Sequence, residues 1–302
     1  MTLPLTALIA AELAEPVDSR VTEMAAAVAA LYPQAARAVL FYGSCLRESQ
    51  LDGLMLDFYL IVSDYDAAYG KGWLARANRL IPPNVFPFEH HGLSAKYAVL
   101  SEEDFARLCG EKADNISVWA RFAQPARLVW SADERARATV TNAVANAAPT
   151  LLRLALPGVE ADRRGDWRAL FEYGFSRTYG AELRAERKGR SVSIIDSAPD
   201  RYRRIFDAAV AQGAIDPAAP VGARERRAHD RLWGRLQRRG KWLSVIRLAK
   251  ASFTFANGID YLAWKINRHA GTQIVITPWQ RRHPLLAALT LLPRLMLKKA
   301  VG

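Results

Sequence analysis

Residues 38–62 read AVLFYGSCLRESQLDGLMLDFYLIV, and this stretch decides the fold. It contains two apolar runs, AVLFY at 38–42 and LMLDFYLIV at 54–62, and both are rich in residues that favour β-strands. Gly43 and Ser44 end the first run, and Asp57 lies in the middle of the second. We therefore expect two buried strands joined through a tight turn, with Ser44 at the start of a helix.

The sequence around this stretch predicts the remaining elements. Residues 1–35 have the apolar spacing of two helices, SAKYAVL at 94–100 reads as a third strand, and 127–130 as a fourth. Ser101 followed by Asp104 is typical of a helix N-cap. From Asp133 onward the pattern is mainly helical. The expected fold class is α+β: a mixed sheet with helices over residues 1–145, a helical, basic domain over 146–282, and an amphipathic segment at 283–302.

The Gly-Ser turn and the strand carboxylate together carry the chemistry. A glycine lets the backbone approach a phosphate closely, and a following helix start favours an anion. Mg²⁺ prefers carboxylate and phosphate oxygens, which Asp57 and a nucleotide would supply. This is the pattern of the nucleotidyltransferase fold, although Tyr59 stands where many such enzymes have a second carboxylate. Asp57 as a purely structural carboxylate is the alternative interpretation.

The charge of the chain is divided unevenly. Residues 1–150 hold 13 Lys+Arg and 17 Asp+Glu, a balance of 13 − 17 = −4, whereas residues 151–302 hold 29 and 13, a balance of 29 − 13 = +16. Such asymmetry points to an anionic partner, and nucleic acid and an anionic lipid surface both fit it. The Arg-rich stretch 224–241 and the basic, apolar segment 283–302 suit a membrane surface, but a solvated helix face and a docked terminal helix are the alternatives.

The sequence also bounds where the protein works. Two cysteines, Cys45 and Cys109, are too few for a disulfide framework, so we expect a reducing compartment. Residues 1–13 lack the basic start and cleavage site of a signal peptide, and no apolar run reaches the roughly 18 to 20 residues of a membrane span. These observations predict a cytoplasmic protein that is at most peripheral to the membrane.

Several segments resemble the mitochondrial translocator-maintenance family of phosphatidate cytidylyltransferases, which are peripheral CDP-diacylglycerol synthases with a nucleotidyltransferase domain. The resemblance is carried, in the family's order, by FYGSCLRESQLDGLMLDFYLIVSDYDAAY at 41–69, AKYAVLSEEDF at 95–105, WARFAQPARLVW at 119–130 and TYGAELRAERKGR at 178–190, and more loosely by 251–271. It covers roughly residues 38–270 and is that of a bacterial-type relative.

The resemblance implies a role for each matching residue. Nucleotide and phosphate binding is implied for Tyr42, Gly43, Ser44 and Lys96, catalysis for Asp57 and Lys96, metal binding for Asp57, Asp64 and Glu182, and binding of the substrate phosphate for Arg184. Cys45 replaces a usual glycine, Glu182 replaces an aspartate, and the stretch between Asp66 and Ser94 is shorter than in the family.

The activity so implied is CTP + phosphatidate → CDP-diacylglycerol + diphosphate, with Mg²⁺ as cofactor, at the inner face of the cell membrane. Two alternatives stay open. One is a nucleotidyltransferase with a soluble acceptor, and the other is a non-catalytic nucleic-acid- or membrane-binding module on a degenerate transferase fold. On the first interpretation no nucleic acid is expected as a partner, and the sequence leaves the oligomeric state open.

Overall fold

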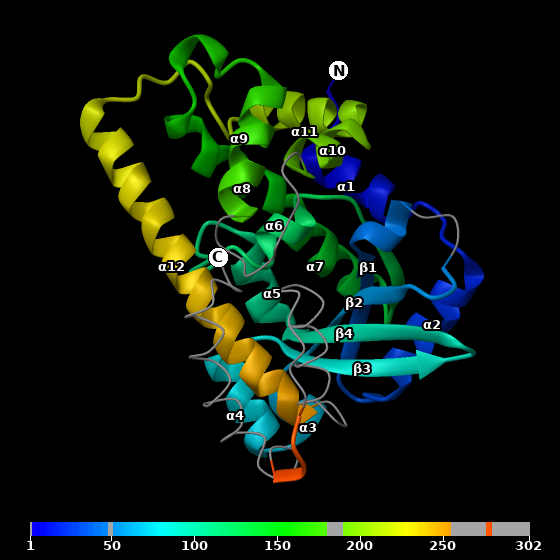
Figure 1. The fold of residues 1–302 in the computed structure, drawn as a ribbon. Helices are drawn as coiled ribbons and strands as arrows, with labels where there is room; N and C mark the ends of the chain where they lie inside the picture. The colour runs from blue at the N-terminus through cyan, green and yellow to red at the C-terminus, as the bar shows by residue number, and fades with distance from the viewer. Residues whose placement is uncertain (1, 48–50, 180–189, 255–275, 280–302) are drawn as a thin grey trace.

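The computed structural model describes residues 2–47, 51–179, 190–254 and 276–279 (Figure 1). Five strands form one mixed sheet in the order β3-β4-β2-β1-β5. The strands are β1 (Ala36–Tyr42), β2 (Met55–Val62), β3 (Asn84–His90), β4 (Leu93–Ser101) and β5 (Ala126–Ser131). β2 pairs with β4 in parallel, and the other three pairings are antiparallel.

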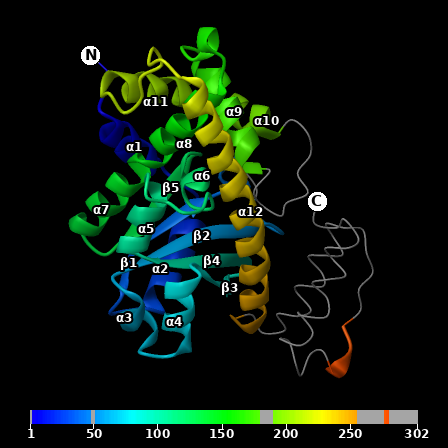
Figure 2. The same cartoon turned by 90° about the vertical axis from the view of Figure 1, so that its left-hand side faces the viewer.

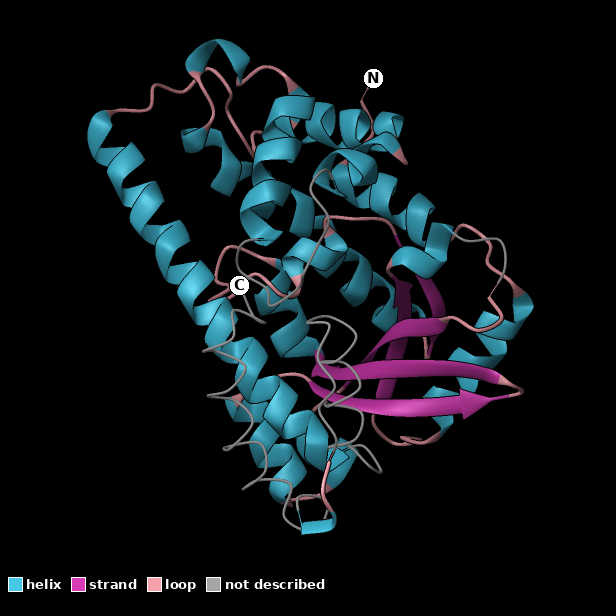
Figure 3. Ribbon diagram, viewed as in Figure 1, coloured by secondary structure: helices cyan, strands magenta, loops and turns pink. Residues whose placement is uncertain are grey.

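Helices surround the sheet and make up most of the chain after it (Figure 3). In the first half they are α1 (Leu5–Leu13), α2 (Ser19–Ala30), α3 (Tyr65–Tyr69), α4 (Trp73–Leu80), α5 (Glu102–Cys109), α6 (Trp119–Phe122) and α7 (Glu134–Ala145). In the second half they are α8 (Ala147–Ala155), α9 (Trp167–Tyr179), α10 (Arg190–Asp196), α11 (Pro199–Ala211) and α12 (Ala223–Thr254). Three short 3₁₀ turns are η1 (Ser44–Arg47), η2 (Leu156–Gly158) and η3 (Ala161–Arg163). The predicted α+β class, a mixed sheet followed by a helical part, is confirmed.

The alternation of side chains along the strands places a core on each face of the sheet. Leu40, Tyr59 and Ala98 belong to a large core that α1, α5, α7, α8, α9 and α11 complete. Phe58 and Val99, one residue away along their strands, belong to a smaller core that α2 and α3 cover. The central strands are therefore apolar on both faces, which explains the nearly continuous hydrophobic runs in their sequence.

The larger core continues through the predicted domain boundary at 145. α7 ends at Ala145 and α8 begins at Ala147, and buried residues of both helices lie in the same cluster. A buried ion pair joins Glu12 of α1 to Arg201 of α11, and Arg201 also donates to the backbone oxygen of Ala123 at 2.8 Å. The helical part therefore packs directly on the sheet. The predicted segment 283–302 lies outside the described residues.

α12 is the longest helix of the described chain and runs along one side of the molecule (Figure 2). Its apolar face is fixed by Trp233, whose indole Nε1 donates to the backbone oxygen of Leu154 at 3.0 Å and whose ring packs against Trp119. Further along, the ammonium group of Lys250 donates to the backbone oxygen of Ile81, just before β3. The helix is thus attached to the body at two positions, about a third of the way along it and near its C-terminal end. Within the described residues, no helix is long and apolar enough to cross a membrane.

Candidate active site

The turn after β1 brings the backbone against the carboxylate of Asp57. Gly43 adopts φ +96°, a conformation that side chains disfavour. A Cβ at this position would lie 3.2 Å from Oδ2 of Asp57, which is tighter than ordinary van der Waals contact. A glycine is therefore required both by the backbone conformation and by the carboxylate beside it.

The strand register aligns the expected residues in one row across the sheet. Tyr42 of β1 is the antiparallel partner of Asp57, and Lys96 of β4 is its parallel partner. Pro87 of β3 and Ala126 of β5 complete the row. Because directly paired residues point to the same face of a sheet, Tyr42, Asp57 and Lys96 share one face.

Asp57 and Lys96 form an ion pair in this row. Nζ of Lys96 lies 2.9 Å from Oδ1 of Asp57, and the two side chains are 33% and 20% exposed, in that order. The pair is therefore only partly buried as a whole, although Oδ1 of Asp57, the atom that faces Lys96, is itself shielded from solvent. The carboxylate of Asp57 and the ammonium group of Lys96 are thus paired, and the Gly43 turn lies against that carboxylate.

Residues next to the turn hold it in position. The thiol of Cys45 is buried and donates to the backbone oxygen of Met55 at 3.4 Å, which ties the turn to the start of β2. Burial raises the pKa of the Cys45 thiol, and the negative charge of Asp57 raises it further. The thiol is therefore protonated at neutral pH and acts as a structural donor. The ring of Tyr42 packs on Tyr59 and Phe122, with centroids 5.2 and 5.8 Å away, and belongs to the core rather than to the open side of the turn.

Ser44 is exposed at the turn and begins a short helix there, which is a 3₁₀ helix. Ser44 begins the four-residue 3₁₀ turn η1, which has too few aligned peptide groups to provide the dipole of an α-helix. Any anion binding at this point therefore depends on the Ser44 hydroxyl, nearby backbone amides and Lys96. A helix does begin at Ser44 as predicted, but it is a single 3₁₀ turn that follows the positive φ of Gly43, so the helix dipole expected to favour an anion there is weak.

The structure places Asp64 away from this row. Asp64 follows the end of β2 and is the N-cap of α3, where its Oδ1 accepts from the backbone amides of Asp66 and Ala67, each at 2.8 Å. Asp64 lies two residues beyond the end of β2, and the five strand steps from Asp57 to Val62 alone span about 17 Å. The expectation that both carboxylates bind one metal is therefore corrected. Glu182 and Arg184, the other predicted residues, lie outside the described residues.

The fit of Mg²⁺ rests on Asp57 alone among the described residues. In that part of the chain, no three Asp, Glu, His or Cys side chains gather in a manner that could hold a metal ion. Mg²⁺ commonly binds through one or two carboxylates, with waters and substrate phosphates completing its coordination. One partly exposed carboxylate beside a glycine turn is compatible with that mode and not with an all-protein metal cage.

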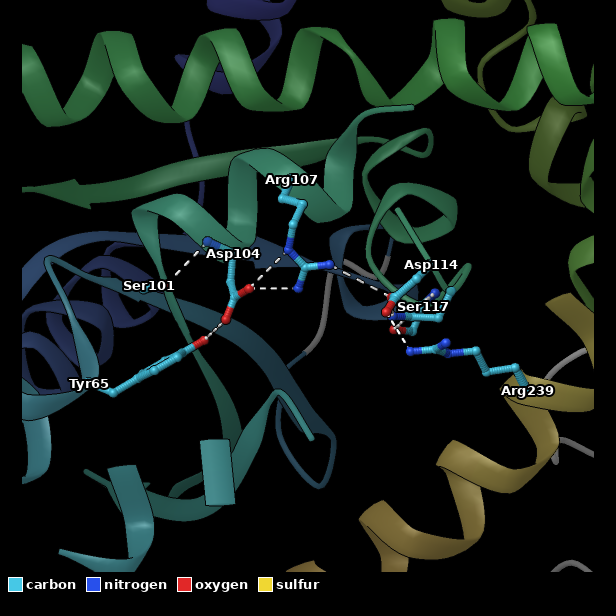
Figure 4. Close-up of polar contacts among 8 residues, drawn as sticks. Tyr65, Ser101, Asp104, Arg107, Asp114, Ser117 and Arg239 are labelled. Carbon is cyan, nitrogen blue, oxygen red and sulfur yellow. Dashed lines mark hydrogen bonds and ion pairs between the residues drawn. The ribbon is translucent and has the colours of Figure 1, made fainter. Parts of the chain in front are cut away.

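A polar network that the sequence did not reveal connects the sheet to α12 (Figure 4). The hydroxyl of Tyr65 donates to Oδ2 of Asp104 at 2.6 Å, and Arg107 donates to Oδ1 of the same carboxylate at 2.6 Å. Arg107 lies 3.8 Å from Asp114, which pairs with Arg239 of α12 at 2.5 Å. Burial, followed by the neighbouring Asp104, raises the pKa of the Tyr65 phenol. The hydrogen bond from the Asp104 amide to the Ser101 hydroxyl was visible in the sequence. The contact of the Asp104 side chain with Tyr65 was not, because the two residues are 39 positions apart.

Comparisons with known proteins leave the family of this chain open. No family model matches it, and no curated protein sequence matches it. Among solved structures it is similar to a nucleotidyltransferase-like protein from Exiguobacterium sibiricum 255-15, with 13% identity, 92% of this chain and 91% of that chain covered, and a TM-score of 0.28. Similarity at this level says nothing about activity.

Proposed function

We propose that this protein is a nucleotidyltransferase and, more specifically, a phosphatidate cytidylyltransferase that makes CDP-diacylglycerol at a membrane surface. The observation that carries the proposal is that the Gly43 turn lies beside the partly exposed carboxylate of Asp57, which shares a row across the sheet with the ammonium group of Lys96. The finer assignment to phosphatidate is supported by the sequence resemblance of segments 41–69 and 95–105, which contain this row.

The proposed reaction joins two anions. An oxygen of the phosphatidate phosphate forms a bond to the α-phosphorus of CTP, and the bond from that phosphorus to the bridging oxygen breaks. Diphosphate then leaves with the electron pair. Because the second pKa of a phosphomonoester is about 6, the attacking oxygen is already negatively charged at neutral pH and requires no strong base. The main task of the protein is therefore to reduce charge repulsion and to position the two phosphates.

The residues of the row suit this task. The Gly43 turn allows the nucleotide phosphates to approach the backbone closely, and Lys96 supplies a positive charge beside them. Asp57 would hold Mg²⁺, which when bound supplies charge neutralisation for the triphosphate and the leaving group. In the absence of ligands, the Lys96 ion pair keeps the Asp57 carboxylate oriented beside the turn.

The acceptor is inferred from the second half of the chain. Its balance of 29 basic against 13 acidic residues favours an anionic substrate surface. Residues 182 and 184 lie within the resembling segment 178–190, so Glu182 and Arg184 keep their proposed roles toward metal and lipid phosphate. The proposed location is the cytoplasmic face of the membrane, with the protein bound peripherally.

The test is to incubate the purified full chain with radiolabelled CTP, Mg²⁺ and vesicles that contain phosphatidate. Formation of labelled CDP-diacylglycerol and release of diphosphate are expected, and both should be strongly reduced with Asp57→Asn. The matched control is Asp52→Asn, which removes an exposed carboxylate that pairs only with Arg20 among the described residues. Label transferred to a soluble acceptor instead of the lipid would reject phosphatidate and retain nucleotidyl transfer. No transfer by folded protein to any acceptor would reject both.

A further inference from the structure

The solvent-facing side of α12 carries a line of arginines. Arg224, Arg227, Arg231, Arg235 and Arg238 are all exposed and are three or four residues apart, so they lie on one face of the helix. The opposite face is fixed to the body by Trp233, Leu236 and His229, which are buried. Because the buried face cannot rotate outward, the arginines have a fixed orientation toward solvent.

The same line ends in exposed apolar side chains. Trp242 is 61% exposed and Ile246 is 39% exposed, and they continue the spacing of the arginines at intervals of four residues. From Arg224 to Ile246 the line covers 22 helical steps, or about 33 Å. We call these seven residues the α12 outer face.

Arginines elsewhere on α12 have partners in the body, whereas those of the outer face do not. Arg226 lies 3.8 Å from Glu160, and Arg239 pairs with Asp114. Within the described part of the chain, no carboxylate lies within ion-pair distance of the five outer-face arginines. Among the described residues, the outer face is therefore a fixed row of positive charges without ion-pair partners, a surface complementary to an extended anionic one.

We propose that the α12 outer face docks onto an anionic lipid bilayer, with the helix axis parallel to the membrane plane. Arginines along a helix attract anionic headgroups, and tryptophan is the side chain most suited to the interface between headgroups and acyl chains. A nucleic acid would satisfy the arginines but gives no role to an exposed tryptophan and isoleucine at the end of the row. Stacking on bases requires several aromatic side chains, and the outer face has only one.

The experiment measures binding of the full chain to vesicles in the absence of nucleotide. The vesicles contain phosphatidylcholine with or without phosphatidylserine, and phosphatidate is omitted to avoid occupying the proposed active site. The triple variant Arg227→Gln/Arg231→Gln/Arg235→Gln should bind the anionic vesicles roughly 100-fold more weakly, since each basic residue near the surface contributes a severalfold factor. Trp242→Gln should weaken binding by about tenfold and should leave its salt dependence unchanged.

Matched controls separate the outer face from general charge. Arg76→Gln/Arg135→Gln/Arg203→Gln removes three exposed arginines from α4, α7 and α11, and Trp73→Gln removes a tryptophan that is 55% exposed on α4. Both controls should bind like the wild type. Equal losses in the controls, or binding of duplex DNA or single-stranded RNA in preference to vesicles, would overturn the proposal. Vesicle binding without cytidylyl transfer would reject the proposed function and leave this inference intact.

Discussion

A carboxylate lies near each end of β2, and the two carboxylates have different hydrogen-bond and ion-pair partners. Asp64, beyond the last residue of the strand, accepts two backbone amide hydrogen bonds as the cap of α3. Asp57, near the first residue, has a lysine on one side and a glycine turn on the other, and its side chain is 20% exposed. The comparison teaches that the surroundings of a carboxylate decide its role: Asp64 is committed to backbone amides, whereas Asp57 faces a lysine and a glycine turn.

Replacing Asp57 gives the largest expected effect and the most direct test of this contrast. Asp57→Asn keeps the shape of the side chain and removes the charge that would hold Mg²⁺, so kcat/KM for cytidylyl transfer should fall about 10³-fold. Asp64→Asn should retain activity within about twofold, because asparagine is also a good N-cap. Steady-state rates on phosphatidate vesicles measure both. Equal losses in the two variants would mean that the ends of β2 are not functionally distinct.

Lys96 comes next, because it is the cation on the same row as Asp57. Lys96→Met should lower kcat/KM about 10²-fold, since it removes the charge that would neutralise a phosphate and leaves Asp57 without its ion-pair partner. Lys96→Arg keeps the charge and should recover part of that loss. The measurement is kcat and KM for CTP. A Lys96→Met enzyme with unchanged kinetics would reduce Lys96 to a structural partner of Asp57.

Alanine variants of Gly43 and Gly92 can separate two effects of a side chain at a positive-φ position: the backbone strain and the contact with the Asp57 carboxylate. Gly43→Ala should cost about 1–2 kcal/mol of unfolding free energy, since alanine disfavours positive φ, and should also lower activity because its Cβ displaces the Asp57 carboxylate. Gly92→Ala is the matched control. Its φ is +78°, but nothing lies within 4 Å of an added Cβ, so it should lose similar stability and keep its activity.

Denaturant unfolding and the transfer assay, applied to both glycine variants, complete that comparison. If Gly43→Ala loses stability without losing activity, the close approach of the turn to Asp57 is not required for the reaction. If Gly92→Ala also loses activity, the effect comes from the strained backbone and the row is not specifically involved.

Much of the sheet was predictable because its central strands are buried on both faces. The runs at 38–42, 54–62, 94–100 and 127–130 correspond to β1, β2, β4 and β5, and the predicted Ser101 cap is confirmed. β3 was missed because Pro82, Pro83 and Pro87 read as breakers of regular structure. β3 is an edge strand, where a proline removes no essential hydrogen bond of the sheet.

The sequence indicated which residues belong to the candidate site, but not that they are neighbours. Asp57 and Lys96 are each in the middle of a recognisable strand, but only the pairing of β2 with β4 makes them neighbours. Sequence proximity was misleading for Asp64, because the five strand steps from Asp57 to the end of β2 already separate the two positions by about 17 Å. The network from Tyr65 through Asp104 to Arg239 depends on helix packing, for which a single sequence carries no direct signal.

The smallest expected effect comes from truncating the Asp64 cap. Asp64→Ala removes both hydrogen bonds to the α3 amides and should cost about 1 kcal/mol of unfolding free energy, which is typical for the loss of an N-cap. Cytidylyl transfer should stay near the wild-type rate, because α3 lies at the end of β2 opposite the row. Urea unfolding and the transfer assay measure the two quantities on one preparation. A large loss of activity with little loss of stability would show that Asp64 acts on the substrate after all, and the contrast between the ends of β2 would fail.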